Sequence, residues 1–123
     1  MEMEIEIKRV YDEVDRDDGF RVLVDRVWPR GMTKEQVKAD LWLKEVAPST
    51  ALRIWFGHDR SKWEDFRARY AKELEGKDEH IAKLLEKARY GRVTLLIASR
   101  EREINQAIVL KDYLLARAAR KSL

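Results

Sequence analysis

The sequence predicts an α/β protein: a single three-layer, Rossmann-like domain with a small, mostly parallel sheet, flanking helices and an N-terminal hairpin. Three observations predict this fold. Two segments near the N-terminus have the composition of strands, one segment near the C-terminus is apolar on both faces, and amphipathic helical patterns lie between them. Strands separated by helices are best joined in parallel through a right-handed crossover, which places the helices against the sheet.

The first two strands are expected near the N-terminus. Residues 3–10 alternate between polar and apolar side chains, as a half-buried strand does, and "FRVLVDRV" at 20–27 is rich in β-branched residues. Between them, "DRDDG" at 15–19 supplies residues that favour turns. We therefore expect these two strands to pair as an antiparallel hairpin with a long loop.

Helical patterns fill the middle of the chain. Thr33 and Gln36 have the spacing of a capping box, which predicts a short helix after Gly31. The segment that follows has an apolar side through Val46, and Pro48 ends it.

Three further helices are expected before the last strand. Ser49 can cap a helix that runs to Phe56, with Gly57 in the left-handed position that ends many helices. Apolar residues then recur at helical spacing over 63–74 and again over 81–88.

The C-terminal part completes the predicted sheet. "VTLLIA" at 93–98 suits a central, fully buried strand, and a helix is expected from about Glu103 to Arg120. No linker or internal repeat interrupts the chain, so we predict one domain over residues 1–123.

Composition excludes several classes of function. The chain contains no cysteine and only two histidines, His58 and His80, which argues against disulfides, thiolate nucleophiles and metal sites, and we predict neither metal nor cofactor. No segment has the character of a signal peptide or a membrane span, so a cytoplasmic location is expected. The abundance of charged residues, 40% of the chain, with few asparagines and glutamines suggests a thermophilic source.

Two strand exits carry the residues of greatest interest. "DRVWPRGM" follows the strand at 20–27, and "SREREIN" follows the strand at 93–98. Ligands of open α/β sheets bind beyond the carboxyl ends of parallel strands. If the two strands are neighbours, Arg26 or Arg30 shares one rim with Ser99, Arg100 and Asn105, where arginine forks suit a carboxylate or phosphate.

Each of these features also has a structural interpretation. Asp25 can pair with an arginine, and Trp28 is either a stacking platform for a ring or a lid on the core. His58 is either a proton-transfer group or cation, or a residue that hydrogen-bonds a helix end. The residues alone leave both interpretations open.

Long motifs connect the chain to a known family. "DRVWPRG", "LWLKEVAPSTALRIWFGHD", "KWEDFRARYAKEL" and "VTLLIASREREINQAIVL" resemble, in order and spacing, the YeaO-like branch of the bacterial and archaeal family called domain of unknown function 488. The resemblance covers nearly the whole chain and supports the fold more than any reaction. The matching polar positions that a core does not require are Arg26, Arg30, Lys44, Ser49, Arg53, His58 and Asn105.

The resulting hypothesis is a cleft lined by arginines that binds a nucleotide, phosphate ester or carboxylate. Its predicted ligand-binding residues are Arg26, Trp28, Arg30, Lys44, Ser49, Arg53, Ser99 and Asn105. The sequence does not predict whether a reaction occurs; if one does, His58 is the catalytic candidate. The expected partner is a small anionic molecule, with no membrane.

A second hypothesis, from another class, is a module that binds nucleic acid or protein. It would use the basic C-terminal helix around Lys111, Arg117, Arg120 and Lys121. The net charge of +3 permits this interpretation without demanding it, because a solvated helix face explains such a basic run more often.

Overall fold

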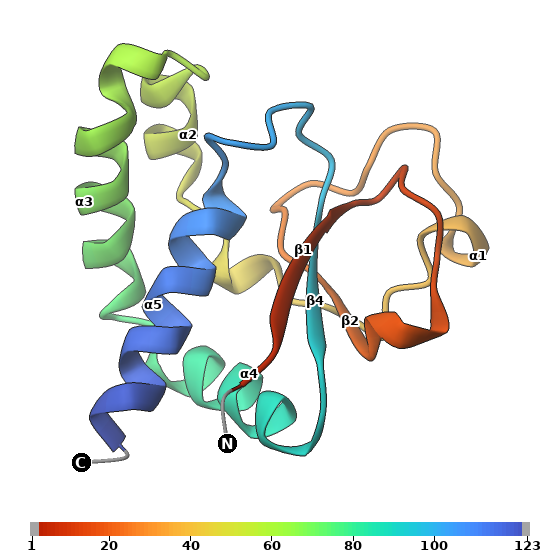
Figure 1. Ribbon diagram of the computed structural model, residues 1–123. Helices are drawn as coiled ribbons and strands as arrows, with labels where there is room; N and C mark the ends of the chain where they lie inside the picture. Colours follow the sequence, from red (N-terminus) through yellow and green to blue (C-terminus); the bar gives the residue numbers. More distant parts are fainter. Residues whose placement is uncertain (1–2, 122–123) are drawn as a thin grey trace.

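The sheet at the centre of the protein has four strands, all parallel, in the order β1-β4-β2-β3. The computed structural model describes residues 3–121 (Figure 1). Its strands are β1 (Ile5–Arg9), β2 (Phe20–Leu23), β3 (Leu41–Trp42) and β4 (Val93–Ile97). This arrangement confirms the predicted α/β class with a small parallel sheet.

The expected N-terminal hairpin is wrong. β4 lies between β1 and β2 and pairs in parallel with both, with Leu95 opposite Ile7 on one side and Val22 on the other. Alternation in a sequence identifies a strand but not its partner. The fully buried β4 is apolar on both faces, so it takes the centre and accepts a strand on each edge.

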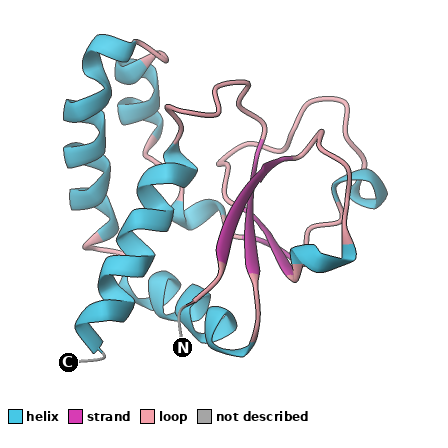
Figure 2. Cartoon of the chain, in the orientation of Figure 1, coloured by secondary structure: helices cyan, strands magenta, loops and turns pink. Residues whose placement is uncertain are grey.

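Helices cover both faces of the sheet, as Figure 2 shows. One face carries α2 (Thr50–Phe56), α3 (Trp63–Leu74), α4 (Asp78–Tyr90) and α5 (Gln106–Lys121), and the other carries the short α1 (Lys34–Val37). Residues 3–121 also contain three 3₁₀ turns: η1 (Arg16–Asp18), η2 (Lys44–Val46) and η3 (Arg60–Lys62).

The strands divide their side chains between two cores. Val22 and Leu95 belong to the larger core beneath α2 to α5, whereas their neighbours Leu23 and Leu96 belong to a smaller core with Val37. This division follows from the two-residue period of a strand, which sends successive side chains to opposite faces. The three predicted layers result from it.

Several predicted helix ends are confirmed. The Ser49 hydroxyl accepts the backbone N–H of Leu52 at the start of α2, and Gly57 ends that helix in the left-handed conformation. Thr33 and Gln36 form the expected capping box.

The expected apolar helical segment before Pro48 is interrupted, because α1 ends at Val37 and the chain enters the edge strand β3. Buried Arg21 explains this end. It donates to the carbonyls of Val37 and Lys38, at 2.8 and 3.0 Å, and it pairs with Asp18. Lys38 is itself in the left-handed conformation.

The last helix begins at Gln106 rather than near Glu103. Buried Asn105 accounts for the difference, since its side-chain oxygen accepts the N–H of Ile108 at 3.2 Å and its amide nitrogen donates to the carbonyl of Glu101 at 2.7 Å. Asparagine in this capping role holds the preceding loop in a non-helical conformation. No helix within residues 3–121 is long and apolar enough to cross a membrane.

Candidate ligand-binding cavity

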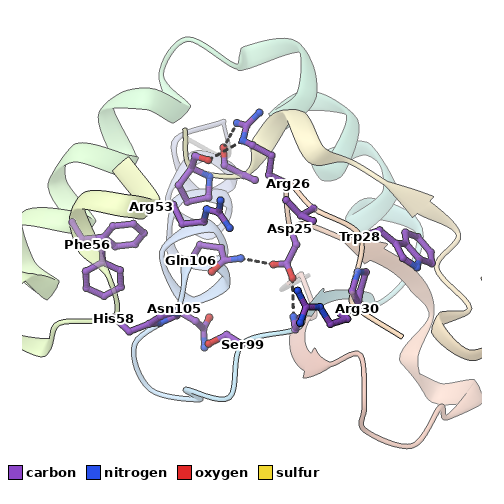
Figure 3. Close-up of a pocket in the computed structure, with 16 residues that line it drawn as sticks. Asp25, Arg26, Trp28, Arg30, Arg53, Phe56, His58, Ser99, Asn105 and Gln106 are labelled. Atoms are coloured by element: carbon purple, nitrogen blue, oxygen red, sulfur yellow. Dashed lines mark hydrogen bonds between the residues drawn. The ribbon is translucent and has the colours of Figure 1, made fainter. Parts of the chain in front are cut away.

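A cavity of about 310 Å³ opens beyond the carboxyl ends of β2 and β4. Its lining comes from the loop after β2, from Ala47 and Pro48 between η2 and α2, from α2 and α3, from the loop after β4, and from the start of α5 (Figure 3). The predicted site residues that line it are Arg26, Trp28, Arg30, Arg53, His58, Ser99 and Asn105. The two strands are neighbours, so the two predicted exits do share one rim.

Asp25 forms the floor of this cavity. Its carboxylate accepts the N–H of Ala98, just after β4, at 2.8 Å, and it accepts the side-chain amide of Gln106 at the start of α5. Burial raises the pKa of Asp25 to about 6, against the opposing effect of the Ala98 and Gln106 hydrogen bonds and the Arg53 charge. Asp25 therefore joins three elements at the one place where the cavity is acidic.

Sequence reasoning considered Asp25 only as an ion-pair partner and did not single out Gln106. The signal for Asp25 was its position just beyond the end of a strand, where α/β proteins place functional groups. Gln106 gave no such signal. Its importance depends on the approach of α5 to the end of β2, which is a contact across the fold.

Arg26 is committed to the backbone. Its guanidinium donates to the carbonyls of Ala47 and Pro48, both at 3.1 Å, and so ties the loop after β2 to the segment before α2. Two of its nitrogens are thereby occupied. Arg26 shapes one wall of the cavity more than it offers charge to a ligand.

Arg30 and Arg53 are the available cations at the mouth. Both side chains are exposed, and within residues 3–121 neither donates a hydrogen bond nor closes an ion pair. Arg53 extends from α2 toward the space above Asp25 (Figure 3), close enough for its charge to lower the pKa of that carboxyl. An anion in the cavity would meet both guanidinium groups without breaking an existing contact.

Trp28 packs as part of the small core. Its indole donates to the carbonyl of Met32 at 2.6 Å and meets Trp42 edge to face at 5.4 Å. In Figure 3 the ring lies beyond Arg30, away from Asp25. This geometry favours the interpretation that Trp28 is a lid on the core, because both its ring and its N–H are already in use.

Aromatic rings provide the apolar wall instead. Phe56 and Phe66 stack with their centroids 4.3 Å apart and both line the cavity, as do Pro29 and Pro48. The His58 ring lies 5.9 Å from that of Phe56, on a residue with a positive φ of 58°. His58 is exposed and makes no hydrogen bond within the described part of the chain, so the interpretation that it bonds a helix end finds no support.

Ser99 and Asn105 hold the loop after β4. The Ser99 hydroxyl accepts the N–H of Glu101 at 3.1 Å, and its carbonyl accepts Nε of Arg9 at 2.9 Å. Asn105 is only 2% exposed, and its side-chain amide hydrogen-bonds to the backbone of Glu101 and of Ile108 at the start of α5. Both residues shape the rim through these contacts.

Lys44 and Ser49 are not among the residues that line the cavity. The Ser49 hydroxyl donates to Glu73 at 2.7 Å, which fixes α2 against α3. The Lys44 ammonium lies 5.4 Å from the Trp42 ring. Within residues 3–121, no group of three histidine or acidic side chains is arranged to hold a metal ion.

Comparison with known proteins places the chain in a family. Residues 4–122 match the family described as the inactive DUF488-N3 subclade. The chain belongs to this subclade. The match confirms the resemblance to domain of unknown function 488 that the motifs indicated.

Several proteins similar to this DUF488-N3 chain are described as uncharacterized. YeaO of Escherichia coli K12 is 40% identical over 112 residues, covering 91% of this chain and 97% of YeaO. Rv3073c of Mycobacterium tuberculosis and Mb3100c of Mycobacterium bovis are each 45% identical over 73 residues, 59% of this chain and 62% of theirs. No solved structure matches the chain.

Proposed function

We propose that this protein binds a small anionic ligand in the cavity at the carboxyl ends of β2 and β4. The observation that carries the proposal is Arg53, which faces the cavity from α2 with an exposed side chain that has no hydrogen-bond or ion-pair partner within residues 3–121; Arg30 also lines the cavity. Guanidinium groups bind carboxylates and phosphates with two parallel hydrogen bonds. The cavity volume of about 310 Å³ lies at the lower end of the range for small-molecule sites.

Binding without turnover is the form of this function that we favour. The family is described as an inactive subclade. His58 and Asp25 are the lining residues whose side chains are suited to proton transfer, and they do not hydrogen-bond to each other. A cytoplasmic location and a thermophilic source accompany the proposal as predictions from the sequence.

The test compares two arginine variants of the same charge. Arg53→Gln removes the proposed anion contact, whereas Arg89→Gln removes an exposed guanidinium on α4, 65% exposed and outside the cavity lining. Each protein is titrated with butyrate, ethyl phosphate and purine riboside 5′-monophosphate, and with the amino-bearing counterpart of each. The amide NMR shifts of the protein report binding. We expect saturable shifts around the cavity in the wild-type protein and in Arg89→Gln.

In Arg53→Gln the dissociation constant of the bound anion should rise by roughly tenfold or more, because a charge-assisted hydrogen bond is lost. An equal affinity in the two variants would contradict the assignment of Arg53. The absence of saturable shifts with every probe would contradict the proposed function itself.

The alternative nucleic-acid module is not favoured by the arrangement of α5. Arg117 is paired with Asp78 at 2.9 Å and hydrogen-bonds the Tyr113 hydroxyl. The exposed positions of α5 between Gln106 and Arg120 are Asp112, Ala116, Ala119 and Arg120, so they do not form a continuous basic stripe. The side chain of Lys121 lies outside the described part of the structure.

A further inference from the structure

The charges of the cavity are separated by depth. The Asp25 carboxylate at the floor is largely buried, whereas the guanidinium groups of Arg30 and Arg53 at the mouth are exposed. The rest of the lining includes apolar side chains, among them the stacked rings of Phe56 and Phe66. A ligand that enters the cavity therefore meets a cationic rim first and an acceptor at its far end.

Asp25 retains unused capacity to accept hydrogen bonds. One carboxylate oxygen accepts the N–H of Ala98 and the other accepts the side-chain amide of Gln106. An ionised carboxylate has about four lone-pair sites, so each oxygen of Asp25 can accept one more donor. Since Asp25 lines the cavity, a ligand is placed to supply those donors.

A plain anion fits the floor poorly. Its negative charge would approach the Asp25 carboxylate, and in a partly buried site the repulsion between like charges is stronger than in water. The charge of Arg53 reaches Asp25 but forms no ion pair with it, and Arg26 donates instead to the carbonyls of Ala47 and Pro48. An amine or amidine, in contrast, would donate hydrogen bonds to the Asp25 carboxylate, while an anionic group of the same ligand bound the arginines at the mouth.

We propose that the ligand is bipolar: besides the anionic group bound by Arg53, it carries an N–H donor group, an amine or amidine, that hydrogen-bonds to Asp25. This inference rests on the proposed anion-binding function and narrows its ligand class. It makes Asp25 the residue that determines specificity, with Gln106 and the Ala98 N–H holding the carboxylate in place.

The experiment uses pairs of probes that differ in the amino group alone. They are γ-aminobutyrate with butyrate, phosphoethanolamine with ethyl phosphate, and adenosine 5′-monophosphate with purine riboside 5′-monophosphate. Each is titrated into the wild-type protein at pH 7.5, a condition chosen to keep Asp25 ionised. For at least one pair, we expect the amino-bearing member to bind about tenfold or more tightly, as a hydrogen bond to a charged group would give.

The variant Asp25→Asn tests the residue directly. Asparagine has the same shape, and its amide can keep both existing contacts if Gln106 turns its own amide to present oxygen. We expect the preference for the amino-bearing member to fall to within about threefold in Asp25→Asn. The matched control, Asp112→Asn on α5, removes an exposed carboxylate outside the cavity lining and should retain the preference.

The outcomes separate the two proposals. Equal binding of both members of every pair, with loss of affinity in Arg53→Gln, would overturn the bipolar ligand and leave anion binding intact. Tighter binding of the members that lack the amino group would do the same. Failure of all six probes to bind would overturn the anion-binding function and this inference with it.

Discussion

Asp25 occupies a position that costs the protein stability. Burial raises its pKa from 3.8 to about 6, so the folded state holds a proton that the unfolded state has already released. Folding is therefore favoured by this residue's protonation, and the advantage is lost as the pH rises from about 4 through about 6. At neutral pH the buried, ionised carboxylate lowers the free energy of unfolding, as functional residues often do.

Replacing Asp25 should relieve that burden. We expect Asp25→Asn to unfold at a higher Tm than the wild-type protein at pH 7.5, by roughly 5–10 °C, because two pKa units correspond to at most about 3 kcal/mol. The difference should shrink below pH 6 and vanish near pH 4. Thermal unfolding followed by circular dichroism across this pH range measures it.

A lower Tm in Asp25→Asn at every pH would contradict this account. It would mean that the charged hydrogen bonds to Ala98 and Gln106 outweigh the cost of burial. The control is again Asp112→Asn, whose carboxylate is 58% exposed and whose replacement should leave the pH dependence unchanged.

The sequence predicted which residues lie at the cavity better than it predicted what each of them contacts. Arg26 and Arg53 both matched motifs of the family, yet Arg26 is bound to carbonyls 21 and 22 positions away and Arg53 has no such partner within residues 3–121. Whether an arginine is free depends on which backbone the fold brings beside it. The role of Trp28 also depends on the fold, because the ring of Trp42 packs against it.

The turn before β2 leaves no room for a side chain at Gly19. Gly19 has a φ of +69°, and a side-chain carbon there would lie 2.1 Å from the carbonyl oxygen of Arg92. That same oxygen accepts the N–H of Phe20 at 2.9 Å, at the point where β2 begins to pair with β4. Gly31 offers a comparison, because its φ is +76° but nothing lies within 4 Å.

The two glycines should therefore respond differently to the same substitution. We expect Gly31→Ala to lower the free energy of unfolding by about 1 kcal/mol, the cost of a left-handed backbone for alanine. Gly19→Ala should lower it by roughly 3 kcal/mol or more, since the added carbon also displaces a strand backbone. Urea unfolding of both variants compares them directly, and equal losses would show that the contact with Arg92 can relax.

The elements also show where prediction from sequence succeeds and fails. α2 was predicted to its capping residues, because Ser49 and Gly57 act within one turn of the helix. The partner of β1 was predicted wrongly, because β4 lies more than eighty residues along the chain and no local pattern records it. β3 was missed for a related reason: Leu41 and Trp42 form a strand only because β2 is beside them.

For the whole molecule, the layered arrangement explains why a cavity forms where it does. The loops after β2 and β4 leave the same end of the sheet, and α5 starts there with Gln106 directed at Asp25. The sequence predicted this meeting of two loops from the assumption that the strands were neighbours. It did not predict the depth of Asp25, which depends on the packing of α2 and α5 over the strand ends.

The distribution of charge over the molecule allows a test of the alternative function, nucleic-acid binding by α5. The chain has 26 basic and 23 acidic residues, and its surface cations are interspersed with carboxylates, as in the pairs Arg67–Asp112 and Arg117–Asp78. A protein that neutralises several phosphates of a single strand loses affinity steeply as salt rises, with a slope of magnitude about 0.7 per contacted phosphate. We therefore expect single-stranded RNA to bind weakly, with a slope of magnitude no greater than about two between 50 and 200 mM salt.

Fluorescence anisotropy with a labelled oligonucleotide measures this slope, and the double variant Lys111→Gln, Arg120→Gln should leave it unchanged. A slope near five that falls in the double variant would show that α5 binds the RNA backbone after all. Such a result would not remove the cavity, whose arginines lie on α2 and in the loop after β2. It would instead mean that anions meet this protein on two separate surfaces.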